Sequence, residues 1–213
     1  MQPLETLLRE AEIAHGHLCA GQILGVRMAM LGCHMLGIDE PRSGPDRKRL
    51  VTFVEIDRCA TDAIAVVTGC RLGKRALKFR DWGKMAATFV DLSTPLEALA
   101  APVAANEAIP TYKAIRIAAL ESSKARAREL YPHIEAKNAQ QMLAYRELPD
   151  AELFSTEWVS IPLHAREMPG YKSARIACDL CGEGINYDRE VVLDGSTLCQ
   201  SCAFPESRYY QPL

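Results

Sequence analysis

Residues 178–202 read CDLCGEGINYDREVVLDGSTLCQSC, and they decide how the end of the chain folds. Two Cys-x-x-Cys pairs, Cys178/Cys181 and Cys199/Cys202, are separated by seventeen residues. This spacing is typical of a site in which four thiolates bind one tetrahedral zinc ion. Because cysteine occupies every ligand position, the predicted site is closed and structural. The alternative interpretation of the same spacing is two redox-active dithiol pairs.

Zinc is expected to hold this module together, because so short a segment buries little apolar surface. Binding in zinc-finger peptides contributes about 10–16 kcal/mol, which then becomes folding free energy. Residues 185–192 and a turn at Asp194-Gly195 predict a hairpin between the two cysteine pairs. Few basic residues lie in the module, which favours a protein contact or dimerisation over DNA binding.

The whole chain has 213 residues, of which 48% are hydrophobic and 24% charged, as in ordinary globular proteins. The sequence predicts an α+β core domain over residues 1–165 and the zinc finger over residues 172–213, joined by a linker at Met168-Pro169-Gly170. A net charge of -2 does not favour nucleic acid or an anionic membrane as a partner. With no apparent signal peptide or membrane span, the eight cysteines indicate a reducing, cytoplasmic setting.

Periodicity and capping residues predict the elements of the core domain. Gly21, Gly25 and Gly32 fall within one predicted helix, where they indicate close packing against a neighbour. The segments 76–79 and 85–92 predict a hairpin around Asp81-Trp82-Gly83. The predicted helices are 4–14, 21–36, 59–67, one beginning at Thr94-Pro95, 112–131 and 134–145, and the predicted strands are 49–56, 76–79, 85–92 and 154–163.

Near the N-terminus, His15, His17 and Cys19 alternate along the chain, so that two or more of them can face the same way. Cys19 and Cys59 each stand at the start of a predicted helix, where the helix dipole lowers a thiol pKa. Two thiols with imidazole suit zinc or a second transition metal in the core. Alternatively, these cysteines are packing residues and the histidines lie at the surface.

Four motifs give the first ninety or so residues a resemblance to a known family. They are HGHLCAG (15–21), CATDAI (59–64), GCRLGK (69–74) and DWGKMA (81–86), in that order. The chain resembles the FmdE family, which is named after formylmethanofuran dehydrogenase and some members of which carry a terminal zinc finger of the treble-clef type. Ala20 and Arg71 depart from the family pattern, where proline and threonine are usual.

This resemblance implies an α+β core, an accessory zinc finger and a homodimer. It implies a functional site containing His17, Cys19 and Cys59, with further candidates nearby. Those candidates are His15, Asp62, Cys70 and Lys74.

Three functions follow as hypotheses. The first is a metal-binding accessory protein that serves a molybdenum or tungsten enzyme, as the resemblance implies. The second is a thiol- or metal-dependent enzyme with Cys19 or Cys59 as nucleophile and a neighbouring histidine as base. The third is a regulator whose zinc finger binds nucleic acid or protein.

Overall fold

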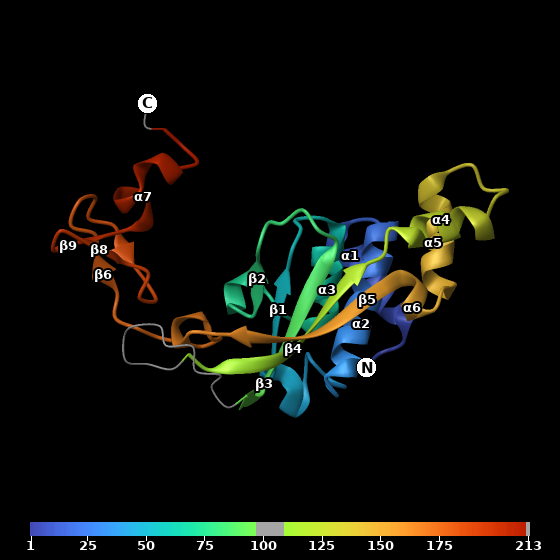
Figure 1. The fold of residues 1–213 in the computed structure, drawn as a ribbon, viewed down its shortest axis with the longest axis horizontal. Coiled ribbons are helices and arrows are strands. Elements are labelled where there is room, and N and C mark those ends of the chain that lie inside the picture. Colours follow the sequence, from blue (N-terminus) through green and yellow to red (C-terminus); the bar gives the residue numbers. More distant parts are fainter. Residues whose placement is uncertain (97–108, 212–213) are drawn as a thin grey trace. The chain divides into compact units, whose positions relative to one another are not determined.

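The computed structural model describes residues 1–96 and 109–211 of the chain. They form two compact units, the core unit Met1–Leu163 and the terminal unit His164–Leu213 (Figure 1). Each unit buries its own cluster of apolar side chains. Helices and mixed strands confirm the predicted α+β class. No helix among the described residues is long and apolar enough to cross a lipid bilayer.

The core unit contains a five-stranded sheet and its helices. Its helices are α1 (Leu4–His15), α2 (Ala20–Met35), α3 (Cys59–Thr68), α4 (Ser122–Leu130), α5 (Lys137–Glu147) and α6 (Asp150–Leu153). Its strands are β1 (Leu50–Val54), β2 (Leu77–Phe79), β3 (Ala86–Leu96), β4 (Thr111–Ala119) and β5 (Phe154–Pro162). The structure therefore confirms the first three predicted helices and all four predicted strands, which are β1, β2, β3 and β5.

The strand order is β2-β1-β3-β4-β5, which shows that the predicted hairpin of β2 and β3 is wrong. Strand β1 separates the two, pairing in parallel with β2 and antiparallel with β3. The reason is the helix α3, which connects β1 to β2 as a crossover and so makes these strands parallel. The loop that follows then carries the chain to the other side of β1.

The predicted helix over residues 112–131 is wrong in its first half. Those residues form β4, which pairs with β3 and β5 along most of its length. Ala114, Ile115 and Ile117 of this strand are fully buried. Burial on both sides of the sheet thus overrides the helix propensity of the alanines. Helix α4 forms only in the second half, and Pro132 separates it from α5 as predicted.

The helix predicted to start at Thr94-Pro95 is also wrong as far as Leu96, and its remainder lies outside the described residues. Strand β3 continues through Pro95, which lies opposite Tyr112 of β4. The register shifts between Val90 and Pro95, and pairing with β1 has already ended at Asp91. Proline is tolerated at such a position because bulges and unpaired strand edges need no ladder hydrogen bond.

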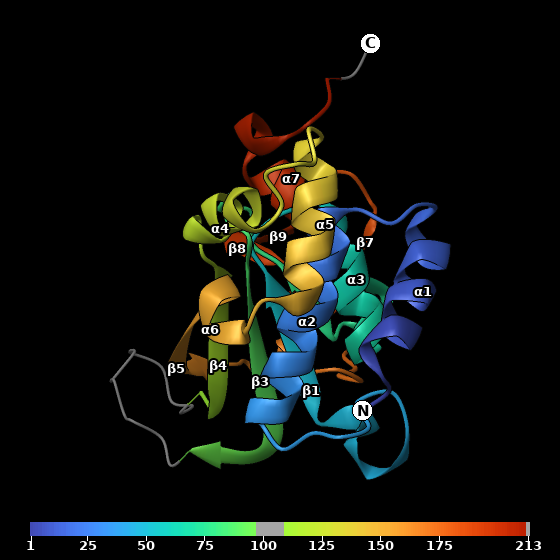
Figure 2. The same cartoon turned by 90° about the vertical axis from the view of Figure 1, so that its right-hand side faces the viewer.

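Helix α2 is the centre of the helical layer beside the sheet, with α1, α3 and α5 in contact with it (Figure 2). It buries side chains on almost all sides, among them Ile23, Val26 and Met28, as expected of a helix that is apolar all round. Gly32 lies against the ring of Phe89 from β3, where an added Cβ would come within 2.4 Å. The close packing predicted from the glycines is therefore confirmed, and α2 is tied directly to the sheet.

Gly25 holds α2 close to α3, which leads to a test of the fold. A Cβ on Gly25 would lie 2.5 Å from the carbonyl oxygen of Ala60 and 2.7 Å from its Cα. Replacement by alanine should destabilise the core unit by about 1–3 kcal/mol, although alanine is the better helix former. Urea unfolding measures the loss. Gly73→Ala is the control, because nothing lies within 4 Å of a Cβ there; equal stability of the two variants would contradict the assignment.

The terminal unit is built from short elements around the cysteine pairs. These are β6 (Ile176–Ala177), β7 (Gly184–Ile185), β8 (Val191–Leu193), β9 (Ser196–Leu198) and α7 (Gln200–Ala203). The predicted turn at Asp194-Gly195 is confirmed, with φ of 50° and 78° as a type I′ turn requires. The hairpin is shorter than predicted, because it joins β8 to β9 while β7 pairs with β6.

Candidate functional site

The terminal unit brings the four predicted zinc ligands together. The Sγ atoms of Cys178, Cys181, Cys199 and Cys202 all lie within 4.8 Å of one another. Cys181 Sγ and Cys199 Sγ are 3.9 Å apart. A tetrahedron with Zn–S bonds of about 2.3 Å has sulfur atoms about 3.8 Å apart. The residues therefore fit a tetrahedral zinc ion, which would supply the bonds that link the two pairs.

Backbone amides already favour a thiolate at this site. The Cys199 N–H donates a hydrogen bond to Cys178 Sγ at 3.3 Å. Amides of Cys181 and Cys199 lower the pKa of Cys178 to about 6. By contrast, the neighbouring Cys199 thiol and burial raise the pKa of Cys202 to about 12. Four thiolates this close repel one another, so all four ionise only when a cation joins them.

The terminal unit has only a small apolar cluster among its described residues. Among the described residues, its buried cluster consists of Cys178, Cys202 and Ile185, with Leu198 and Cys199 packed against it. A single fully apolar buried side chain gives far less burial than a domain needs. The metal is thus expected to provide most of the folding free energy of this unit.

In the core unit, Cys19 and Cys59 meet at the starts of two adjacent helices. Cys19 is the N-cap residue of α2, and Cys59 is the first residue of α3. Gly21 shows how close they are, since an added Cβ there would lie 3.5 Å from Cys59 Cβ and 3.8 Å from Cys19 Sγ. The close approach of α2 and α3 at Gly25 therefore creates a thiol pair from two distant motifs.

The thiol of Cys59 has a raised pKa, so the lowering predicted from its helix position is wrong. Burial is the largest cause, and the adjacent Cys19 thiol adds to it. Arg58 acts in the opposite direction but is the smaller influence. Desolvation and the neighbouring thiol outweigh the backbone amide at the start of the helix, because both disfavour the thiolate form of Cys59.

Both thiols open onto a cavity of about 540 Å³. His17 lines it beside them, as do apolar side chains of Leu24, Ile56 and Met85. Among the described residues, however, the terminal cysteines are the only group in which three or more metal-binding atoms lie within 4.8 Å of one another. The core thus presents a pair of thiols with a histidine in the same wall, and not an assembled three-ligand site.

The remaining candidates from the sequence lie at different distances from this cavity. His15 Nδ1 and Asp62 Oδ2 are 2.8 Å apart, and the His15 and His17 rings have centroids 4.9 Å apart. Asp62 therefore holds His15, whose ring contacts that of His17, and neither Asp62 nor His15 lines the cavity. Cys70 is buried beneath β1, with Thr52 Oγ1 donating to its Sγ at 3.5 Å. Neither Cys70 nor Lys74 lines the cavity.

Sequence reasoning missed the part of the cavity wall that comes from α5 and the start of α4. Its residues are Glu121, Lys124, Asn138, Gln141 and Tyr145. The backbone N–H of Ala20, the first residue of α2, donates to Asn138 Oδ1 at 3.3 Å. No local pattern marks these residues, because they reach the thiols only when α5 packs against α2 and α4 packs against α5.

Comparison with known proteins now identifies the chain. Residues 14–155 match the family model described as "FmdE, Molybdenum formylmethanofuran dehydrogenase operon". The chain belongs to the FmdE family. Residues 170–208 of this FmdE protein match the model of the prokaryotic dksA/traR C4-type zinc finger. The predicted family and the predicted four-cysteine finger are both confirmed.

Two known proteins are similar to this FmdE chain. It is 32% identical over 207 residues to a "Probable S-adenosyl-L-methionine-binding protein" of Archaeoglobus fulgidus, covering 94% of the chain and 53% of the relative. The chain thus spans about half the length of that curated protein. A crystal structure of a "tungsten formylmethanofuran dehydrogenase subunit e (fmde)-like protein" from Syntrophus aciditrophicus has the same fold, with a TM-score of 0.55 and 17% identity. That comparison covers 97% of this chain and 95% of the other.

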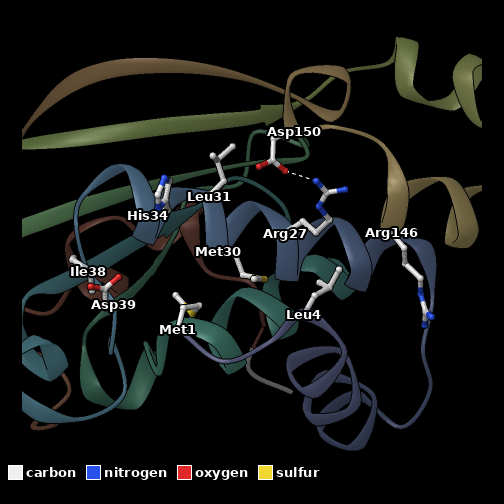
Figure 3. Close-up of a pocket in the computed structure, with 10 residues that line it drawn as sticks. All are labelled: Met1, Leu4, Arg27, Met30, Leu31, His34, Ile38, Asp39, Arg146 and Asp150. Atoms are coloured by element: carbon white, nitrogen blue, oxygen red, sulfur yellow. Dashed lines mark hydrogen bonds and ion pairs between the residues drawn. The ribbon is translucent and has the colours of Figure 1, made fainter.

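A second cavity of the FmdE domain, of about 400 Å³, contains none of the motif cysteines (Figure 3). Arg27 crosses it and binds groups at the end of α5 and the start of α6. Its guanidinium donates to the carbonyls of Tyr145 and Leu148 at 2.9 and 2.5 Å, and to Asp150 Oδ1 at 2.5 Å. Because these contacts satisfy C-terminal carbonyls of α5, Arg27 is a structural link between helices.

Proposed function

We propose that this chain is an accessory protein that binds a transition metal, or a metal-containing cofactor, for a molybdenum or tungsten enzyme. One observation carries the proposal, namely that Cys19 and Cys59 from separate motifs open onto a single cavity. Paired thiols prefer soft and borderline ions, and a histidine in the same wall extends that preference. The family description and the name of the structural relative support the type of enzyme served.

The ligand set favours an exchangeable ion over a permanently bound structural ion. Cys19 and Cys59 would hold it with two sulfur ligands, and His17 is available as a third. A structural zinc site is closed by four protein ligands, as the terminal unit illustrates. With fewer ligands from the chain, positions stay open to water, to another ligand or to a receiving protein. We propose that the chain serves its partner enzyme as a homodimer, as the family resemblance implies.

The second candidate is an enzyme in which Cys19 or Cys59 attacks a substrate and His17 acts as base. The shared cavity wall of these residues is the observation that favours it. A nucleophilic cysteine is normally activated by a lowered pKa, whereas that of Cys59 is raised. Metal binding needs no ionised thiol beforehand, since the metal itself displaces the proton. The metal-binding function is therefore the better supported of the two.

Metal content tests the proposal directly. The full chain, prepared without oxygen and incubated with zinc, should carry one terminal zinc and one core ion. Cys19→Ala and Cys59→Ala should each lose the core ion and keep the terminal zinc. Mass spectrometry of the metals counts the ions, and anomalous scattering at the zinc edge locates them.

Cys33→Ala is the matched control, because Cys33 is another α2 cysteine but is fully buried in the core. Burial raises its pKa to about 12, as expected of a packing residue. This variant should keep both ions. If Cys19→Ala and Cys59→Ala retain the full metal content, or if the unmodified chain takes up only the terminal zinc, the metal proposal is wrong.

A further inference from the structure

The cavity beside the thiol pair is far larger than a metal ion needs. Its volume is about 540 Å³, within the range of about 300–1,000 Å³ typical of sites for small organic molecules. Apolar side chains of Leu24, Ile56 and Met85 line part of it. These side chains add nothing to the binding of a bare ion, but they would cover the apolar part of an organic ligand.

The charges at this cavity favour an anion. Arg58 lines it and is exposed, and its guanidinium forms no hydrogen bond or ion pair with any residue that the structure describes. The other two charged residues, Lys124 and Glu121, neutralise each other across 2.6 Å. The net charge of these three side chains is therefore positive. Helices α2 and α3 also begin at the cavity, so the positive ends of their dipoles add to this charge.

The α5 wall supplies neutral hydrogen-bonding groups. Asn138 is occupied, since its Oδ1 accepts from the N–H of Ala20. Gln141 is half-buried and its side-chain amide has no hydrogen bond to any other described residue, so that the amide can both donate and accept. An organic ligand with a polar ring or amide would find a partner there.

From these observations we propose that the cavity binds an organic anion, with Arg58 pairing its phosphate or carboxylate group. Gln141 bonds to the polar part of the ligand, and Leu24, Ile56 and Met85 cover its apolar part. This inference rests on the proposed function, since it names the class of ligand that shares the cavity with the metal-binding thiols. The anion lies next to the thiol pair and can provide ligands that the chain itself lacks.

The test uses a matched set of small probes and the full chain. Phenyl phosphate should bind more tightly than inorganic phosphate, which lacks the apolar ring, and more tightly than phenol, which lacks the charge. Benzoate replaces the phosphate by a carboxylate and shows which of the two anionic groups the cavity prefers. Ligand-observed NMR titrations give the dissociation constants.

Arg58→Gln should raise the dissociation constant of phenyl phosphate about tenfold or more, because the variant loses one charge-assisted hydrogen bond. Arg58→Lys should restore part of the affinity, because it keeps the positive charge. Arg128→Gln is the control, since this exposed arginine belongs to α4 and does not line the cavity. No binding to the unmodified chain, affinity equal to that of phenol, or unchanged affinity in Arg58→Gln would each overturn the inference.

Metal content measured on the same samples separates the two proposals. If the unmodified chain binds phenyl phosphate but holds no core ion, this inference is supported and the proposed metal-binding function is wrong. If the chain holds the core ion but binds none of the anionic probes, the metal-binding function is supported and this inference is wrong.

Discussion

Replacing Cys178 with serine is expected to unfold the terminal unit and leave the core unit folded. The four Sγ atoms fit one zinc ion, and only a small apolar cluster surrounds them in the described part of the unit. Loss of the ion removes a contribution of about 10–16 kcal/mol, which is as large as the whole stability of a typical domain, about 5–15 kcal/mol. Hydrogen exchange should show protection lost over residues 176–203 and unchanged in α2 and β3.

Leu180→Ala is the matched control for this experiment. Leu180 lies between two ligands but is 69% exposed, so its removal should leave zinc binding and protection unchanged. Chelation of the zinc should reproduce the effect of Cys178→Ser on the unmodified chain. Retention of stoichiometric zinc and full protection in Cys178→Ser would show that the metal does not hold this unit together.

Zinc affinity should fall as the pH is lowered, because protons compete with zinc for the thiolates. The Cys178 thiol, with a pKa of about 6, ionises most readily and should compete least. Cys202, with its pKa raised to about 12, must lose its proton to the metal. Titration with a chromophoric chelator between pH 5 and pH 8 measures this trend, and an affinity independent of pH would contradict it.

Arg116→Ala is expected to destabilise the core unit strongly. Arg116 of β4 donates two hydrogen bonds of 2.7 Å to Glu55, which follows β1 and is 3% exposed. Without the guanidinium, a carboxylate is left buried and unpaired in the sheet. Such a loss typically costs about 3–5 kcal/mol, which urea unfolding can measure.

Arg126→Ala is a suitable comparison, because Arg126 also binds two carboxylates, Glu129 and Glu152. All three of these side chains are at least 40% exposed, and surface pairs contribute only about 0–1 kcal/mol. The double variant Glu55→Leu/Arg116→Met should recover much of the loss, since it buries no lone charge. If Arg116→Ala and Arg126→Ala lower the free energy of unfolding by similar small amounts, the Glu55–Arg116 pair does not behave as a buried ion pair.

Several expectations failed where the outcome depends on distant residues. The alanines and lysine of residues 111–119 have high helix propensity, yet pairing with β3 and β5 makes the segment a strand. Similarly, β2 and β3 are neighbours in sequence, but β1 lies between them. The pKa of Cys59 also followed its burial and the Cys19 thiol, not its place at the start of α3.

The zinc site, the first helices and the family could be predicted from the sequence alone, because each depends on residues that are close together in the chain. Spacing of the terminal cysteines identified the zinc site, because two residues between ligands suffice to bring both thiolates to one ion. Apolar periodicity located α1 to α3, and the helix glycines indicated where backbones touch. The ordered motifs around Cys19 and Cys59 identified the FmdE family.

Only the tertiary structure decided what surrounds the core thiols. Packing of Gly25 against Ala60 brings Cys19 and Cys59 together, and packing of α5 on α2 adds Asn138 and Gln141 to the cavity wall. A helix pattern states which face is buried, but not which other helix covers it. The shape of the cavity, the desolvation of its groups and the neighbours of each charged side chain depend on which helix packs there. They are therefore properties of the fold.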